Sequence, residues 1–234
     1  MTQSWQAWES KFLEKMAGTG QAPAAMQAVD PAHDIAHFGR VVATAKGLAE
    51  AEKARLEVVI PAAWMHDLVN VPKNDPRRSQ ASRLSAKEAI VFLREIGFAE
   101  AWAPDLASQE RLLEDIGHAI EAHSYSANIE PKTVEAKIVQ DADRLDGLGA
   151  IGVARCFAVS GLLGRQFYDP ASPFGEARAF DDQVNTVDHF YVKLFKTVDT
   201  LKTSAGREEG RRRAAYMRGF LAELAREIGV PFPG

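Results

Sequence analysis

The chain has 234 residues, of which 46% are hydrophobic and 26% are charged, and its formal net charge is −4. This composition is typical of an ordinary soluble globular protein with ample core. A mildly acidic chain has no overall electrostatic attraction to nucleic acids or anionic membranes, so we expect neither among its partners.

Two features predict where the protein resides. Cys156 is the only cysteine, which rules out an internal disulfide and fits a reducing compartment. The first residues lack the charged start and apolar run of a signal peptide, and no window approaches the 18 consecutive apolar residues of a membrane span. We therefore expect a cytoplasmic protein.

Apolar residues recur at helical spacing along most of the chain. They predict helices over residues 4–18, 33–52, 55–70, 79–96, 107–123, 132–146, 183–203 and 205–229. Residues 147–160 are small and apolar, which favours close helix packing, and 19–31 and 161–182 are expected to be loops. The last helix carries Tyr216, Phe220, Leu224 and Ile228 as its expected apolar stripe. No convincing strand or repeat interrupts this pattern, which predicts one all-α domain over 1–234.

An adjacent histidine and aspartate, His66 and Asp67, lie inside the apolar, helix-like run 62–68. Two strongly solvated groups in such a segment are costly unless something compensates them. A divalent metal would do so, because imidazole and carboxylate are both good ligands for transition metals. Two neighbouring residues cannot complete a metal site, so other helices must supply further ligands.

His37 and an acidic residue, either Asp141 or Asp143, are the candidates for those ligands. Two imidazoles and two carboxylates would leave coordination positions open for water and substrate, as in catalytic rather than structural metal sites. A bound divalent metal lowers the pKa of its water and neutralises phosphoryl oxygens. This combination favours hydrolysis of a phosphoester or phosphoanhydride.

The ordered series of a histidine, a later His-Asp pair and a distant aspartate resembles the HD-superfamily metal-dependent phosphohydrolases. Further stretches are similar to one bacterial branch, which has members that act as nucleoside triphosphate pyrophosphohydrolases; they are 72–74, 81–86, 123–126, 141–146 and 149–155. The matching stretches run from about residue 33 to 220. The resemblance implies a single-domain HD-type helical bundle, with a core over about 33–160 and C-terminal helices over 183–229.

Carried over by position, the resemblance implies His37, His66, Asp67 and Asp143 as metal ligands. Asp143 is favoured over Asp141 because the family's last ligand usually lies in an Ala-Asp-x-Leu context, here 142–145. Helical periodicity alone does not separate the two aspartates. The expected cofactor is Mn²⁺ or Mg²⁺, with Fe²⁺, Ni²⁺ and Co²⁺ as alternatives, and the number of metals, one or two, stays open.

Three basic residues are expected to act on the substrate. Lys73 follows the His-Asp helix, where an ammonium group could stabilise transferring phosphoryl charge, unless it is a solvated loop lysine. Arg40, three residues after His37, is expected to contact substrate or to pair with an acid. His123 is expected to bind phosphate or to relay protons. The expected catalytic residues are thus Asp67, Lys73 and His123, and the expected substrate-binding residues are Arg40, Lys73 and His123.

The reaction implied by the resemblance is hydrolysis of a nucleoside triphosphate to the monophosphate and pyrophosphate. A 5′-nucleotidase or another phosphomonoesterase or phosphodiesterase is the alternative. Two further interpretations are an HD-fold diiron oxygenase, which would recruit His118 and His123, and a degenerate HD domain used as a signalling scaffold. A homodimer is compatible with the sequence, which does not distinguish an interface stripe from core.

Overall fold

The structure, a computed structural model, describes residues 4–18, 35–71 and 75–234. The described residues are largely helical and contain no strand, apart from an isolated bridge between Gln166 and Asn185. The prediction of an all-α fold is confirmed. Two sequence-based expectations, the loop over 19–31 and the role of Lys73, lie outside the described residues.

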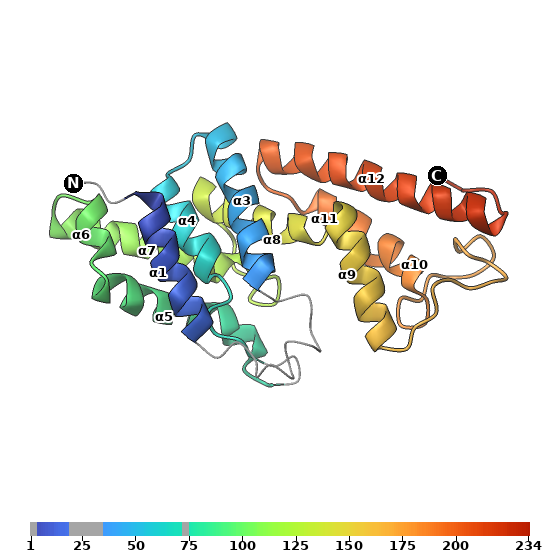
Figure 1. Cartoon of the computed structure of the whole chain (residues 1–234), viewed down its shortest axis with the longest axis horizontal. Helices are drawn as coiled ribbons and strands as arrows, with labels where there is room; N and C mark the ends of the chain where they lie inside the picture. The colour runs from blue at the N-terminus through green and yellow to red at the C-terminus, as the bar shows by residue number, and fades with distance from the viewer. Residues whose placement is uncertain (1–3, 19–34, 72–74) are drawn as a thin grey trace.

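The helices follow one another along the chain (Figure 1). In chain order they are α1 (Trp5–Gly18), α3 (Ile35–Glu52), α4 (Leu56–Met65), the 3₁₀ turn η1 (Arg78–Gln80), α5 (Ala81–Glu95), α6 (Phe98–Trp102), α7 (Leu106–His123), α8 (Val134–Asp146), α9 (Gly149–Leu162), α10 (Thr186–His189), the π-helical segment η2 (Phe190–Leu194), α11 (Phe195–Asp199) and α12 (Ser204–Ile228). The long irregular segment 163–185 joins α9 to α10, as expected of a loop in this region. Side-chain caps begin α7, α8 and α12, where Asp105, Thr133 and Thr203 accept a backbone N–H of the first turn.

Helix α4 is the centre of the first half of the molecule. Every residue over 58–65 is buried, because α3, α7 and α8 pack around this helix and α1 lies against it. Trp64 on α4 donates its indole N–H to Glu9 of α1 at 3.2 Å, and Glu9 also pairs with Lys46 of α3. The apolar run therefore forms the core helix from whose end the His-Asp pair emerges.

Helix α12 lies along α9 and α11 and also contacts α8 and α3 (Figure 1). Two glycines allow this close approach. A Cβ at Gly206 would collide with the Asp141 carboxylate, and a Cβ at Gly210 would collide with Leu201. The buried stripe continues through Met217, Leu221 and Ala225, whereas Tyr216 is exposed. Of the expected stripe, Phe220, Leu224 and Ile228 are partly buried and pack against the core, so the prediction was wrong at Tyr216 alone.

The helix expected over 55–70 is shorter than predicted. It ends at Met65, and His66 and Asp67 lie in the turn that follows it.

Two other helix predictions need correction. The single helix expected over 183–203 is divided into α10, η2 and α11, and it begins later because the backbone and side chain of Thr186 both donate to the Gln166 carbonyl. The short helix α6 was not predicted. It follows Gly97, whose φ of 68° ends α5 in a left-handed turn, and it buries Phe98.

No single helix in the described ranges is long and apolar enough to cross a membrane. The pair α8 and α9, bent by 58°, passes that test only when the two helices are taken together, and buried core helices pass it too.

Candidate metal centre

Three predicted ligands converge from three helices. His37 belongs to α3, His66 directly follows α4, and Asp143 belongs to α8. The Nε2 atoms of His37 and His66 lie 3.6 and 3.8 Å from Oδ1 of Asp143. One ligand atom from each residue falls within 4.8 Å of the others, which is close enough for all three to hold one metal ion.

A second group shares His66 with the first. Oδ2 of Asp67 lies 3.9 Å from His66 Nε2, and Oδ1 of Asp67 lies 3.4 Å from Nε2 of His123 at the end of α7. These atoms also lie within 4.8 Å of one another. The structure thus brings together five of the residues that the sequence singled out, around the buried ring of His66.

The ring orientation of two histidines is fixed by their own helices. Nδ1 of His66 lies 2.8 Å from the Ala63 carbonyl, and Nδ1 of His123 lies 2.6 Å from the Ile120 carbonyl. Because a carbonyl only accepts, Nδ1 must donate the hydrogen in both cases. Nε2 of the neutral His66 ring therefore presents its lone pair to the carboxylates, as expected of a metal-binding imidazole, whereas Nε2 of His123 forms a hydrogen bond with Asp67.

The donor set fits a divalent cation. His66 is fully buried, and within the described ranges its Nε2 has no hydrogen-bond partner although two carboxylates face it. Burial lowers the pKa of His66 to about 4, which keeps the ring in the neutral form that binds metals. Asp67 and Asp143 are 24% and 31% exposed, so solvent and substrate can approach from the carboxylate side. Such a set would hold a divalent metal ion.

The environment of His123 differs from that of His66. Burial lowers the pKa of His123, but the hydrogen bond and negative charge of Asp67, together with the charge of Asp143, outweigh burial and raise it overall. The two buried imidazoles therefore have opposite tendencies to hold a proton, and Asp67 lies between them.

His37 is held differently, by the carboxylate of Asp146, a residue for which the sequence predicted no role. Asp146 Oδ2 accepts from His37 Nδ1 at 2.8 Å, and Arg40 pairs with both oxygens of Asp146. Burial raises the pKa of Asp146, but His37 and Arg40, with the charge of Arg155, hold it below its usual range. Arg40 thus lies beside the ligands in an ion pair, and its contact with substrate stays a prediction.

The other acidic candidate points away from the centre. Asp141 is fully buried, and both its oxygens accept hydrogen bonds from residues 202 and 203. Arg144 of the same helix donates to the Thr200 carbonyl at 2.8 Å. Nε2 of His118 accepts the backbone N–H of Lys132, so His118 belongs to neither metal-capable group of the described residues.

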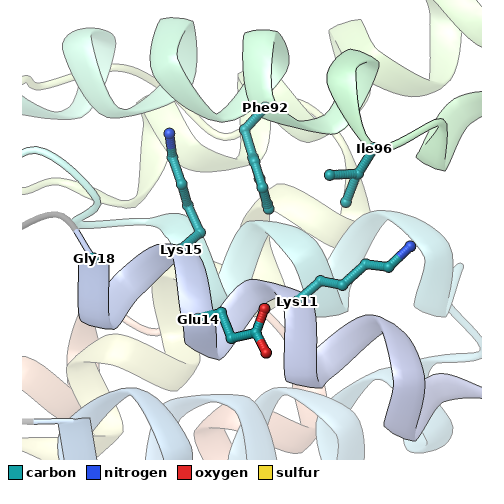
Figure 2. Close-up of a pocket in the computed structure, with 6 residues that line it drawn as sticks. All are labelled: Lys11, Glu14, Lys15, Gly18, Phe92 and Ile96. Atoms are coloured by element: carbon teal, nitrogen blue, oxygen red, sulfur yellow. The ribbon is translucent and has the colours of Figure 1, made fainter.

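A surface pocket lies elsewhere, between α1 and α5 (Figure 2). Its lining consists of Lys11, Glu14, Lys15, Gly18, Phe92 and Ile96. None of the predicted site residues that the structure describes lines this pocket. Lys15 pairs with Glu88 and lies over the Phe92 ring, as expected of a solvated groove between two amphipathic helices.

The all-α fold and the converging His and Asp residues define a metal-dependent hydrolase of the HD type, and the chain matches the HD domain over residues 34–148. The Bacillus subtilis (strain 168) protein YpgQ is 32% identical over 196 residues, which cover 84% of each chain. The chain therefore belongs to the HD superfamily of metal-dependent phosphohydrolases.

Solved structures agree with this assignment. The structure of Bacillus subtilis YpgQ in complex with ADP is similar with a TM-score of 0.59 and 27% identity, covering 96% of this chain and 98% of the other. An HD-superfamily hydrolase from Bacillus thuringiensis is similar with a TM-score of 0.65 and 28% identity, covering 94% and 97%. Both likenesses include α9–α12 as well as the region matched by the HD domain.

Proposed function

We propose that the protein hydrolyses a nucleotide. The substrate class that we favour is a nucleoside triphosphate, which would be hydrolysed to the monophosphate and pyrophosphate. The observation that carries this proposal is the ADP complex of YpgQ, a relative that shares the fold over nearly the whole chain. A nucleotide bound to such a centre presents phosphoanhydride bonds to a metal-dependent phosphohydrolase.

In this proposal His37, His66, Asp67 and Asp143 hold the metal ion. They are supported by the two overlapping groups that share the buried His66 Nε2. A divalent metal at such a site supplies a nucleophilic water at neutral pH and charge compensation for phosphoryl oxygens. Mn²⁺ or Mg²⁺ is the proposed cofactor.

The remaining roles fall to residues beside the ligands. We assign His123 the transfer of a proton at the carboxylate side of the site, which its Nε2 atom, 3.4 Å from Oδ1 of Asp67, supports. Arg40 is proposed to bind substrate phosphates while it pairs with Asp146, and the 31% exposure of its side chain supports this role. Lys73 is proposed for the same task from the sequence alone. The unit that carries the function is proposed to be the whole chain, 1–234.

The test is release of phosphate and pyrophosphate from a panel of nucleoside tri-, di- and monophosphates. Metal-stripped protein is assayed with Mn²⁺ or Mg²⁺ added back, beside His66→Ala and, as a matched control, His118→Ala. Pyrophosphate release from triphosphates that is lost only in His66→Ala supports the proposal. Orthophosphate release from monophosphates moves the assignment to a nucleotidase, and no release from any nucleotide refutes a nucleotide substrate.

A further inference from the structure

Asp146, the last residue of α8, forms hydrogen bonds with side chains of two other helices, α3 and α9. His37 Nδ1 of α3 lies 2.8 Å from Oδ2. Arg40 of α3 donates to Oδ1 at 2.7 Å and to Oδ2 at 3.1 Å, and Arg155 of α9 donates to Oδ2 at 2.6 Å. Asp146 is only 2% exposed, so this is a buried carboxylate bound by one imidazole and two guanidinium groups.

The pairing follows from helical spacing on both sides. His37 and Arg40 are three residues apart on α3, and Asp143 and Asp146 are three residues apart on α8, so each pair shares one helix face. The two faces meet where α3 packs on α8. His37 consequently lies between two carboxylates, with Nδ1 toward Asp146 and Nε2 3.6 Å from Asp143.

This arrangement sets His37 apart from the other two histidines. His66 and His123 donate Nδ1–H to carbonyls three residues earlier in their own chain segments. The partner of His37 is a side chain 109 residues away. Because two arginines already donate to Asp146, the carboxylate acts as an acceptor, and His37 donates Nδ1–H and keeps the lone pair of Nε2.

We propose that Asp146 is a positioning residue, which holds the His37 ring with Nε2 directed at the metal centre and is itself held by Arg40 and Arg155. This inference rests on the proposed function, in which His37 is a ligand of the metal ion. Carboxylates that accept from the second nitrogen of a ligating histidine fix its tautomer and orientation and raise its basicity. Arg155, unassigned from the sequence, acts through Asp146.

The experiment compares Asp146→Ala and Asp146→Asn with Asp141→Asn as the matched control. Asp141 is also a buried carboxylate of α8 with several hydrogen bonds, but its partners are Lys202 and Thr203. The Mn²⁺ dissociation constant of metal-stripped protein is measured by calorimetry, and thermal unfolding of the metal-free protein is measured beside it. The affinity readout needs no nucleotide, so it separates a failure of this inference from a failure of the proposed substrate.

We expect Asp146→Ala to weaken Mn²⁺ binding by about 10–100-fold. Asp146→Asn should weaken it less, because the amide oxygen still accepts from His37 Nδ1. Asp141→Asn should lower thermal stability and leave the Mn²⁺ affinity within about threefold of wild type, because it contacts no ligand. Unchanged affinity in Asp146→Ala, or an equal loss in Asp141→Asn, would overturn the inference.

A measurement on the wild-type protein covers the case in which the Asp146 variants do not fold. In metal-free protein labelled with ¹⁵N-histidine, NMR should show His37 as the Nδ1–H tautomer with a hydrogen-bonded ring proton. Observation of His37 as the Nε2–H tautomer would contradict the inference. The assignment of the His37 signals comes from their loss in His37→Gln.

Discussion

Asp141 accepts hydrogen bonds from both the backbone N–H and the hydroxyl of Thr203, at 2.8 and 2.7 Å, across 62 residues of sequence. Thr203 is the N-cap of α12, so the contact joins the middle of α8 to the start of the last helix. Asp143, two residues later, faces His37 and His66 instead. Two aspartates of one short motif therefore serve different purposes.

Substitution of these two aspartates should separate metal binding from stability. Asp143→Ala should lose bound metal with little change in the free energy of unfolding, because its side chain is 31% exposed. Asp141→Ala should lower the free energy of unfolding by about 2–3 kcal/mol, because it leaves buried donors unsatisfied. Metal content by mass spectrometry and urea unfolding measure the two effects. Loss of metal from folded Asp141→Ala alone would reverse the assignment.

Removal of either member of the His-Asp pair should abolish function. His66→Ala and Asp67→Ala should each reduce turnover by more than about 100-fold, and neither variant should retain metal. This loss exceeds the loss of about 10–100-fold that is typical when a residue that only hydrogen-bonds a metal ligand is removed. His118→Ala, which loses only an acceptor for Lys132, should keep both properties. Near-normal turnover in the His66 and Asp67 variants would refute the ligand set.

The thiol of Cys156 should be unreactive in the native protein. Burial raises its pKa to about 12, and its Sγ–H donates to the Thr186 carbonyl at 3.8 Å. Since the thiolate is the reactive form, labelling by a thiol reagent at pH 8 should be at least about 100-fold slower than in denaturant. Equal labelling rates in the native and denatured protein would show that this part of the core is open.

Glu209 should make stability depend on pH in the acid range. Hydrogen bonds from Arg212 and, to a smaller extent, from Arg213 lower the pKa of Glu209 from 4.5 to about 2. Because the pKa is lowered in the folded protein, the stabilisation is present above pH 4.5 and is lost as the pH falls toward 2. Glu209→Gln should cost up to about 1 kcal/mol at pH 7, as expected of a largely solvated pair.

The measurement is urea unfolding of wild type and Glu209→Gln at pH 7, 5 and 3. The difference in unfolding free energy should be constant between pH 7 and 5 and should be smaller at pH 3. A difference that does not change with pH would mean that the variant acts through packing rather than through the ion pair.

The sequence predicted most of the helices because local apolar periodicity is strong there. It predicted α4 but extended this helix through His66 and Asp67, whereas α4 ends at Met65 and the pair follows it. It did not predict α6 or the start of α10 at Thr186, because these depend on the left-handed Gly97 and on the contact of Thr186 with Gln166. Such features arise from contacts that periodicity does not describe.

For the site, the spacing of His37, His66 and Asp67 was enough to suggest a shared centre, which the geometry brings together. Periodicity could not choose between Asp141 and Asp143, because the choice depends on what α12 brings to the other side of α8. Asp146 was not assigned a role for a similar reason, because that role depends on hydrogen bonds from Arg40 and Arg155 on other helices. The spacing of three between Asp143 and Asp146 was the available signal.

Three aspartates in the last two turns of α8 have separate tasks, on two faces of the helix. Asp141 binds the start of α12, Asp143 faces the histidines, and Asp146 anchors His37. One inserted or deleted residue between them would rotate all later side chains by about 100°. The length of this segment is therefore as constrained as its composition, and insertions during divergence should accumulate in the connection between α9 and α10 instead.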